Sequence, residues 1–165
     1  MRALARKCYD VDVTDDLDPI AAWRAVLLAQ SRAVRAIEAE MESAGAIPLS
    51  WYDVLLELQA APNGQLRMQD LALRTVLSRT RISRVVTELE RAGLVERLAD
   101  PGDGRAALAT ITAEGRRVFR QTAPVYRRSI ATQFTQYLSP PQQRAIARGL
   151  QRVIDAHTAT IDPRR

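Results

Sequence analysis

The sequence predicts a mainly α-helical fold with one small β-wing. Apolar residues recur at helical spacing over most of the chain. Two short helical patterns, at 69–74 and 78–92, are separated by only three residues. Two strand-like segments follow, at 94–99 and 106–111, and a turn rich in Pro, Gly and Asp joins them. Two helices, a short turn and a ribbon, in this order, predict a winged helix-turn-helix.

The remaining chain is predicted to be helical and to flank this motif. At 165 residues, 47% of them hydrophobic and 26% charged, the chain is long enough for one cored domain and short for two. We expect a single intertwined domain. Its predicted parts are an N-terminal arm (1–17), a helical dimerisation region (18–48 and 113–165) and the winged helix-turn-helix region (49–112).

The charge of the chain is basic and comes almost entirely from arginine. The net charge is +5, the sequence pI is about 10.1, and Lys7 is the only lysine. Arginine suits bidentate contacts with phosphate and guanine. Charge alone leaves two alternatives open, a polyanionic partner and a solvated basic surface.

Cysteine usage and hydropathy predict a cytoplasmic protein. Cys8 is the only cysteine, which excludes an intramolecular disulfide and a multi-cysteine metal site. No signal peptide and no membrane span of roughly 20 apolar residues is evident. The sequence also has no paired His or Cys constellation, no glycine-rich phosphate loop and no metal-ligand spacing. We therefore expect no enzyme activity, no metal and no cofactor.

The first helix is predicted to begin after Asp18, an N-cap followed by Pro19. Its apolar residues recur at alternating gaps of three and four, with one polar break at Gln30. This repeat consists of Ile20, Trp23, Leu27, Gln30, Val34, Ile37 and Met41. A 3.5-residue repeat over this length indicates a helix that packs along a partner helix.

The second helix is predicted at 51–60, where Ser50 would be the N-cap and Asp53 the acid of a capping box. The sequence Ala-Pro-Asn-Gly at 61–64 ends this helix. A short strand at 66–68 is expected next.

The helix at 78–92 is predicted to begin at the N-cap Ser78 and to end before Gly93. One face is apolar, and the opposite face carries only arginines and hydroxyls until Glu88. These side chains donate to phosphates and base edges, whereas a solvated helix usually mixes acids and bases at i, i+4. We therefore predict that this face reads double-stranded DNA. The predicted contacts are Ser78, Arg79, Thr80, Arg81, Ser83, Arg84 and Thr87.

The wing is predicted to have a six-residue tip at 100–105, too long for a tight hairpin. Arg105, at the end of the tip, is placed to enter a minor groove beside the major-groove site. Asp103 could fix Arg105 or a neighbouring backbone amide. The alternative is an Asp-Gly turn with an incidental arginine.

The C-terminal part is predicted to form two helices. Thr112 caps the first, whose apolar positions continue to Leu138, with a kink at Pro124. Ser139 begins a capping box for the last helix. Both ends of the chain thus carry helices with more apolar surface than one small domain needs, which implies a homodimer.

The sequence resembles the multiple-antibiotic-resistance regulator (MarR) family of bacterial transcription factors. Three segments carry the resemblance: LSWYDVLLEL at 49–58, SRTRISRVVTELERAGLVER at 78–97, and DPGDGRAALATITAEGR at 100–116. The resemblance implies a helical dimer, held by the first and last helices, that binds a pseudo-palindromic operator and usually represses nearby genes. It also implies that Arg105 faces the minor groove.

The resemblance further implies a small effector, often aromatic or anionic, that binds between the dimerisation helices and the DNA-reading region. The matching positions are Trp23, Arg24, Trp51, Tyr52 and Asp53. Structural roles are the alternatives at two of them, because Trp23 belongs to the apolar repeat and Asp53 stands where a capping acid would.

Some relatives sense oxidants through a cysteine near the N-terminus. Cys8 lies beside Arg6 and Lys7, which would lower its pKa. Two alternatives to a ligand-controlled repressor thus stay open, a redox-sensing regulator and a small-molecule-binding module without a DNA function.

Overall fold

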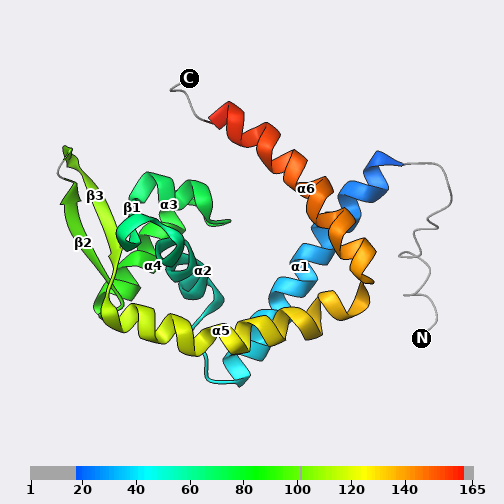
Figure 1. Ribbon diagram of the computed structural model, residues 1–165, viewed down its shortest axis with the longest axis horizontal. Coiled ribbons are helices and arrows are strands. Elements are labelled where there is room, and N and C mark those ends of the chain that lie inside the picture. Colours follow the sequence, from blue (N-terminus) through cyan, green and yellow to red (C-terminus); the bar gives the residue numbers. More distant parts are fainter. Residues whose placement is uncertain (1–17, 101, 162–165) are drawn as a thin grey trace. The chain divides into compact units, whose positions relative to one another are not determined.

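The computed structural model describes residues 18–100 and 102–161, together with their side chains except those of 103–106 and 158–161 (Figure 1). The chain divides into two compact units, Met1–Arg35 and Ala36–Arg165, and each is described by itself. The elements are α1 (Pro19–Ser43), α2 (Leu49–Ala60), η1 (Pro62–Gly64), β1 (Gln65–Arg67), α3 (Met68–Arg74), α4 (Arg79–Arg91), β2 (Val95–Asp100), β3 (Asp103–Ile111), α5 (Ala113–Gln133), η2 (Thr135–Tyr137) and α6 (Pro140–Ile161). This mainly helical fold with a small sheet matches the predicted class.

Helix α1 begins where the sequence predicts. The Ile20 backbone N–H donates to Oδ1 of Asp18 over 2.9 Å, so Asp18 satisfies a free amide of the first turn. The apolar repeat is exposed toward the start of the helix, where Ile20 and Trp23 are 73% and 62% exposed. Toward its end, Ile37 and Met41 are buried.

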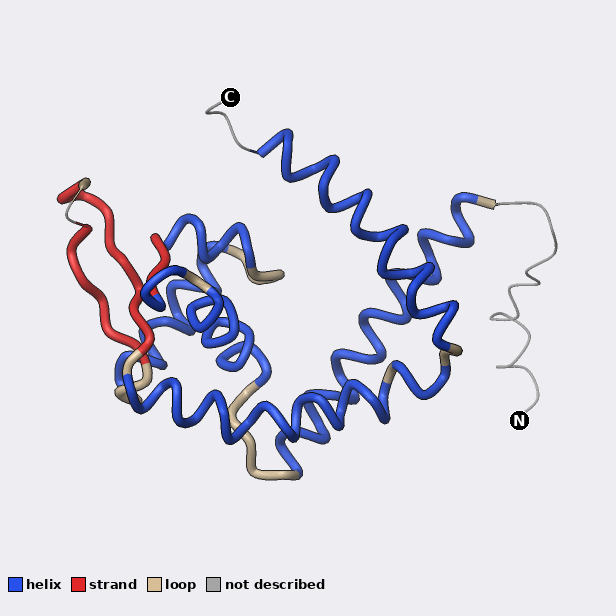
Figure 2. Tube along the Cα trace, in the orientation of Figure 1, coloured by secondary structure: helices blue, strands red, loops and turns tan. Residues whose placement is uncertain are grey.

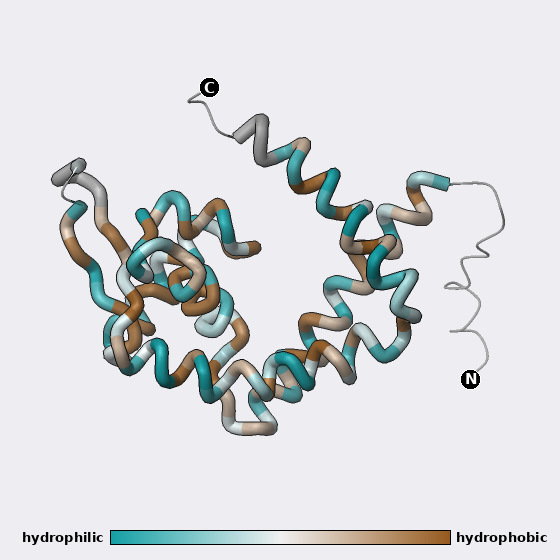
Figure 3. Tube along the Cα trace, in the orientation of Figure 1, coloured by the Kyte–Doolittle hydropathy of each residue, from teal (hydrophilic) through white to brown (hydrophobic). Residues whose placement is uncertain are grey.

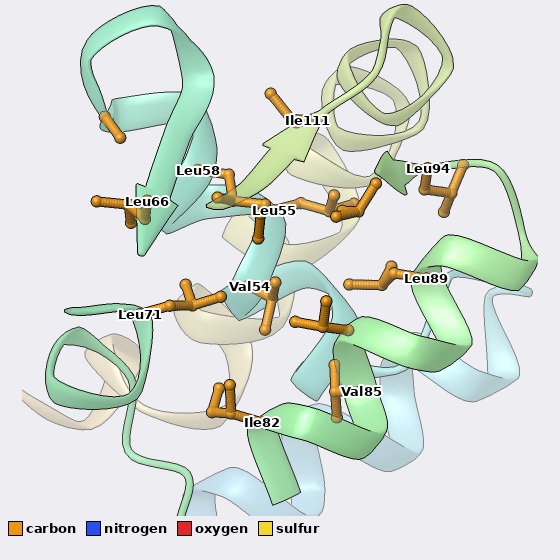
Figure 4. Close-up of a cluster of buried hydrophobic side chains, with 14 residues drawn as sticks. Val54, Leu55, Leu58, Leu66, Leu71, Ile82, Val85, Leu89, Leu94 and Ile111 are labelled. Atoms are coloured by element: carbon orange, nitrogen blue, oxygen red, sulfur yellow. The ribbon is translucent and has the colours of Figure 1, made fainter. Parts of the chain in front are cut away.

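The segment 49–112, here called the reader, has its own hydrophobic core (Figure 4). Helix α2 contributes Val54 and Leu55, and α4 contributes the predicted apolar stripe. Leu55 and Leu89 are completely buried. A buried leucine contributes roughly 1.5–3 kcal/mol by leaving water, so this core holds α4 with its other face outward.

The sheet has three antiparallel strands in the order β1-β3-β2, and they lie together beside the helices of the reader (Figure 2). The predicted two-stranded ribbon is therefore incomplete, because β1 pairs with β3, with Leu66 opposite Ala109. The predicted six-residue tip is wrong as well. The two strands stay paired as far as Asp100, which lies opposite Asp103. The register of the pairing shifts between Ala99 and Asp100, as at a β-bulge.

The predicted start of α2 is also wrong. The helix begins at Leu49, Pro48 occupies the N-cap position, and no side chain caps it. Ser50 is thus inside the first turn, and Asp53 lies two residues too deep to act as a capping acid. The side chain of Asp53 is instead half-buried.

Thr112 joins the reader to α5. Its hydroxyl accepts from the Gly115 N–H over 2.9 Å, as predicted for an N-cap, and donates to the Gly93 carbonyl over 2.8 Å. Gly93 has a φ of 72°, the left-handed conformation expected after the end of α4. Helix α5 continues through Pro124 but ends at Gln133, earlier than predicted, because a short 3-10 turn follows.

Helix α6 shows half of the predicted capping box: Oε1 of Gln142 accepts from the Ser139 N–H over 2.8 Å. The Ser139 hydroxyl donates to the same oxygen over 2.8 Å and does not supply the reciprocal bond. Hydrophobic and hydrophilic positions alternate along α6 (Figure 3). Its apolar residues are exposed, with Val153 at 53% and Ile154 at 55%. Among the described residues, no helix is both long enough and apolar enough to cross a membrane.

Candidate nucleic-acid interface

The N-terminal half of α4 presents the arginine and hydroxyl side chains that the sequence singles out. Ser78 caps the helix by accepting from the Arg81 N–H over 3.3 Å. The side chains of this set are exposed, apart from half-buried Thr87. The exposed members are Ser78, Arg79, Thr80, Arg81, Ser83 and Arg84. The helix N-terminus adds a positive end of the helix dipole to this surface, which favours an anion.

The two acids of α4 are both engaged by residues of other elements. Nε1 of Trp51 donates to Oε2 of Glu88 over 3.0 Å, and Nη1 of Arg97 lies 3.5 Å from Oε2 of Glu90. Within the described residues, by contrast, no side chain pairs with the guanidinium of Arg79 or Arg84. The first turns of α4 therefore keep a positive charge that no acid in the described chain neutralises.

Thr87 differs from the other predicted contacts. Its hydroxyl donates to the Ser83 carbonyl over 2.8 Å and accepts from Nη2 of Arg97 over 2.9 Å. The sequence reasoning did not single out Arg97, because only the pairing of β2 in the sheet shows that its side chain reaches α4. The sequence feature that could have indicated Arg97 is an arginine in the short strand predicted directly after the helix at 78–92.

An open depression of about 410 Å³ lies beside this network, between α3, α4 and the sheet. Arg79 and Ser83 line it from α4, Arg97 lines it from β2, and Met68 and Ala72 line it from α3. The exposed face of α4 and the wing thus border one continuous surface.

The end of β2, at the tip of the wing, is tied to β1 by an ion pair that the sequence reasoning also missed. Nε of Arg67 lies 2.6 Å from Oδ2 of Asp100, which is buried. Oδ1 of Asp100 accepts from the Gly102 N–H over 2.8 Å. The Asp-Pro-Gly sequence was the available signal, since aspartate often accepts from the backbone two residues on.

The predicted wing contacts, Asp103 and Arg105, belong to β3, but their side chains lie outside the described part of the structure. Cys8, the predicted redox residue, also lies outside the described residues. Their roles stay predictions.

The predicted effector positions are distributed over the two units. Trp23 and Arg24 lie in the first unit and are both exposed. In the second unit, Trp51 is half-buried and hydrogen-bonded to α4, as described above. Tyr52 is buried, and its ring lies 5.1 Å from Phe119 and 4.4 Å from Tyr126, measured between ring centroids.

Asp53, next to this aromatic cluster, has a carboxyl group whose pKa is raised. Burial, together with the nearby carboxylates of Glu57 and Glu38, raises its pKa to about 6. Burial also raises the pKa of Tyr126, and Asp53 adds to that rise. Five acidic or phenolic groups from α1, α2 and α5 therefore share one region, and among the described residues no nearby cation lowers the pKa of Asp53.

Replacing Asp53 with asparagine should stabilise the protein at neutral pH. The native carboxyl keeps its proton up to about pH 6 and the unfolded one loses it near pH 4, so stability falls as pH rises between these values. With allowance for solvent screening, Asp53→Asn should gain roughly 1 kcal/mol at pH 7.5, or about 2–4 °C in Tm.

The measurement is Tm against pH for the wild type and Asp53→Asn, with exposed Asp155→Asn as the control. The gain should disappear below about pH 4, where Asp53 is protonated in both states. An equal gain at every pH would mean that ionisation of Asp53 is not its cause.

Known proteins of similar sequence and structure have the same arrangement of helices and wing. A model of the MarR family matches residues 47–106. The HTH-type transcriptional regulator FarR of Neisseria gonorrhoeae is 38% identical over 61 residues, which are 37% of this chain and 42% of that protein. The match thus spans less than half the length of this curated relative.

Two solved structures are similar over much more of the chain. Sco3205, a MarR family transcriptional regulator from Streptomyces coelicolor solved in complex with DNA, is 28% identical with a TM-score of 0.75, over 86% of this chain and 92% of that one. The PcaV transcriptional regulator from Streptomyces coelicolor, solved with its natural ligand, is 29% identical with a TM-score of 0.64, over 86% and 94%.

The family model covers α2 to the wing, and the structural similarity extends to the flanking helices. The relatives are named as transcriptional regulators and not as enzymes. From its helix pair, its capped helix α4, its three-stranded wing and these similarities, we conclude that residues 47–106 match the MarR family and that the fold is similar to that of MarR family transcriptional regulators.

Proposed function

We propose that the protein is a dimeric, sequence-specific DNA-binding transcriptional regulator that represses its target genes until a small molecule releases it. The single observation that carries this proposal is the reading face of α4, where exposed arginines and hydroxyls surround a capped helix N-terminus and both acids are tied back by Trp51 and Arg97. The complex of Sco3205 with DNA supports the same use of this fold.

In the proposed complex, α4 enters the major groove with its N-terminal residues toward the base edges. Arg79 and Arg84 contact phosphates or bases, and Ser78, Thr80, Arg81 and Ser83 supply further donors. Arg105, with Asp103 beside it in sequence, enters the adjacent minor groove. Thr87 stands at the edge of this surface, because its hydroxyl is already engaged in two hydrogen bonds.

A second copy of the chain is the proposed partner of α6. Leu150 and Ile154 are 38% and 55% exposed, and with Ile146 and Val153 they follow one helical stripe. In the other unit, Ile20, Trp23 and Leu27 form a comparable exposed stripe on α1. Exposed apolar stripes of this length are typical of surfaces that pair. The proposed dimerisation regions remain 18–48 and 113–165.

The proposed effector site is the region of Tyr52 and Asp53, where an aromatic ligand would stack on the tyrosine and phenylalanine rings. Burial raises the pKa of Tyr52, and Arg127, which lies close enough to oppose this rise, would supply a cation for an anionic group. From this site, Trp51 reaches Glu88 of α4, so a shift of α2 would be transmitted to the reading helix. PcaV, solved with its natural ligand, supports an effector of this kind.

Selection of bound fragments from the source genome tests the function as a whole. The expected fragments share a pseudo-palindrome whose half-sites are about 10 base pairs apart, because two reading helices of a dimer meet successive major grooves on one side of the duplex. Each fragment should bind two chains. Fragments with no common sequence, or one chain per site, would contradict the proposal. The genes beside the selected sites would indicate the effector.

A further inference from the structure

Arg97 connects the wing to the reading helix at three points. From β2, its Nη2 donates to the Ser83 carbonyl over 3.1 Å and to Oγ1 of Thr87 over 2.9 Å. Its Nη1 lies 3.5 Å from Oε2 of Glu90. These three residues of α4 are spaced i, i+4 and i+7, so a single guanidinium spans one stripe of the helix over two turns.

The backbone that carries Arg97 is itself fixed. Arg97 pairs with Ala109 of the central strand β3, and the flanking pairs, Glu96 with Thr110 and Leu98 with Leu108, continue the register on both sides. Ala109 is completely buried. The side chain of Arg97 is 30% exposed, so most of it is committed to the protein and only a part faces solvent.

The same contacts restrict what Thr87 can do. A hydroxyl has one proton and two acceptor lone pairs. The proton of Thr87 is donated to the Ser83 carbonyl, and Arg97 occupies one lone pair. Thr87 therefore has no donor left for a base edge, although it stands on the face predicted to read DNA.

We propose that Arg97 is a positioning residue that locks the reading face of α4 to the wing, and that Thr87 contributes to sequence discrimination through Arg97 and not by contacting a base. This inference rests on the proposed DNA-binding function. Arg97 sets the angle at which Arg79 and Arg84 meet the major groove relative to the wing. Without the Arg97 side chain, α4 and the wing could contact DNA independently of each other. Correct spacing of the two contacts would then matter less, so the preference for the operator over random DNA would fall.

The test compares a duplex selected from a randomised library with an unselected duplex, for the wild type, Arg97→Gln, Arg97→Lys and Thr87→Val. Arg91→Gln is the matched charge control, since Arg91 is exposed on the same helix and outside the network. Arg97→Gln should reduce the ratio of the two affinities about 10-fold, because hydrogen bonds from a charged group are each worth roughly 1.5–3 kcal/mol. Arg91→Gln should leave this ratio unchanged.

Two further comparisons separate positioning from direct contact. Arg97→Lys keeps the charge but not the planar fork, so it should discriminate as poorly as Arg97→Gln. The ratio of affinities should be the same for the double variant Thr87→Val, Arg97→Gln as for Arg97→Gln alone, because both changes remove the same hydrogen bond between Arg97 and Thr87. The Tm of each variant, measured alongside, should remain within about 4 °C of the wild type, since the lost contacts are partly solvent-exposed.

An unchanged ratio in Arg97→Gln, restoration of discrimination by Arg97→Lys, or additive losses in the double variant would each overturn the inference. A Tm loss that accounts for the drop in affinity on both duplexes would also overturn it. Failure of the proposed function gives a different result, because the wild type itself would then show no salt-sensitive binding to either duplex.

Discussion

A chain in which Arg79 and Arg84 are both replaced by alanine should bind a selected duplex on the order of 10²-fold more weakly, or worse, than the wild type. Each arginine in contact with a base or phosphate contributes roughly 1–3 kcal/mol, and 1.4 kcal/mol corresponds to about a tenfold change in affinity. Both side chains are exposed on α4, and the acids further along the helix are engaged by Trp51 and Arg97. The fold should be unaffected, because neither side chain belongs to the core of the reader.

The matched control is Arg144→Ala with Arg148→Ala on α6. Both residues are exposed, and helical spacing puts them opposite the apolar stripe that contains Leu150 and Ile154. This control removes the same two charges from the chain but none from α4. Fluorescence anisotropy with a labelled duplex measures both variants. Equal affinities of the two double variants would mean that net charge, and not the reading face of α4, sets the affinity.

Replacing Gly115 with alanine should destabilise the fold by roughly 3 kcal/mol, or about 6–12 °C in Tm. Alanine is normally favoured over glycine within a helix by about 1 kcal/mol. At this position, however, a Cβ would lie 2.1 Å from the Leu94 carbonyl oxygen and 2.9 Å from Cγ1 of Ile111. The obstacle is backbone that cannot rotate away, because the Leu94 carbonyl also accepts from the Thr112 N–H over 3.1 Å.

Gly149→Ala on α6 is the control for this prediction. A Cβ on Gly149 would meet nothing within 4 Å in the described chain. This change should therefore raise stability by about 0.5–1 kcal/mol, as expected for an exposed glycine in a helix. Thermal unfolding monitored by circular dichroism gives both values. A stable Gly115→Ala variant would show that the first turn of α5 does not pack against the end of α4 as described.

The sequence predicted the features that depend on neighbouring residues. Ser78 and Thr112 cap their helices, because a cap needs only a hydroxyl within three residues of a free amide. The end of α4 before Gly93 was predictable for a similar reason, because glycine readily adopts the left-handed conformation that follows a helix end without help from distant residues. The apolar stripe of α4 was predictable from spacing alone, and it determined which face of the helix remains exposed.

Features that depend on the pairing of distant segments could not be predicted in the same way. The contact of Arg97 with α4 requires the register of β2 against β3, and the ion pair of Arg67 with Asp100 requires β1 beside β3. The raised pKa of Asp53 depends on burial and on Glu38, which comes from α1. Capping of α2 by Ser50 was mispredicted because the helix already begins at Leu49, so Ser50 stands two places after the N-cap position, which Pro48 occupies.

The claim that this chain reads DNA through a basic helix face is tested most directly by titrating random duplex DNA against the wild type at increasing salt. With about 6–10 phosphate contacts, affinity should fall on the order of 10³- to 10⁵-fold between 50 and 200 mM salt. The plot of log affinity against log salt should be linear, and its slope should be shallower for the Arg79→Ala, Arg84→Ala variant. Retention that does not depend on salt, or no retention at 50 mM, would contradict the claim.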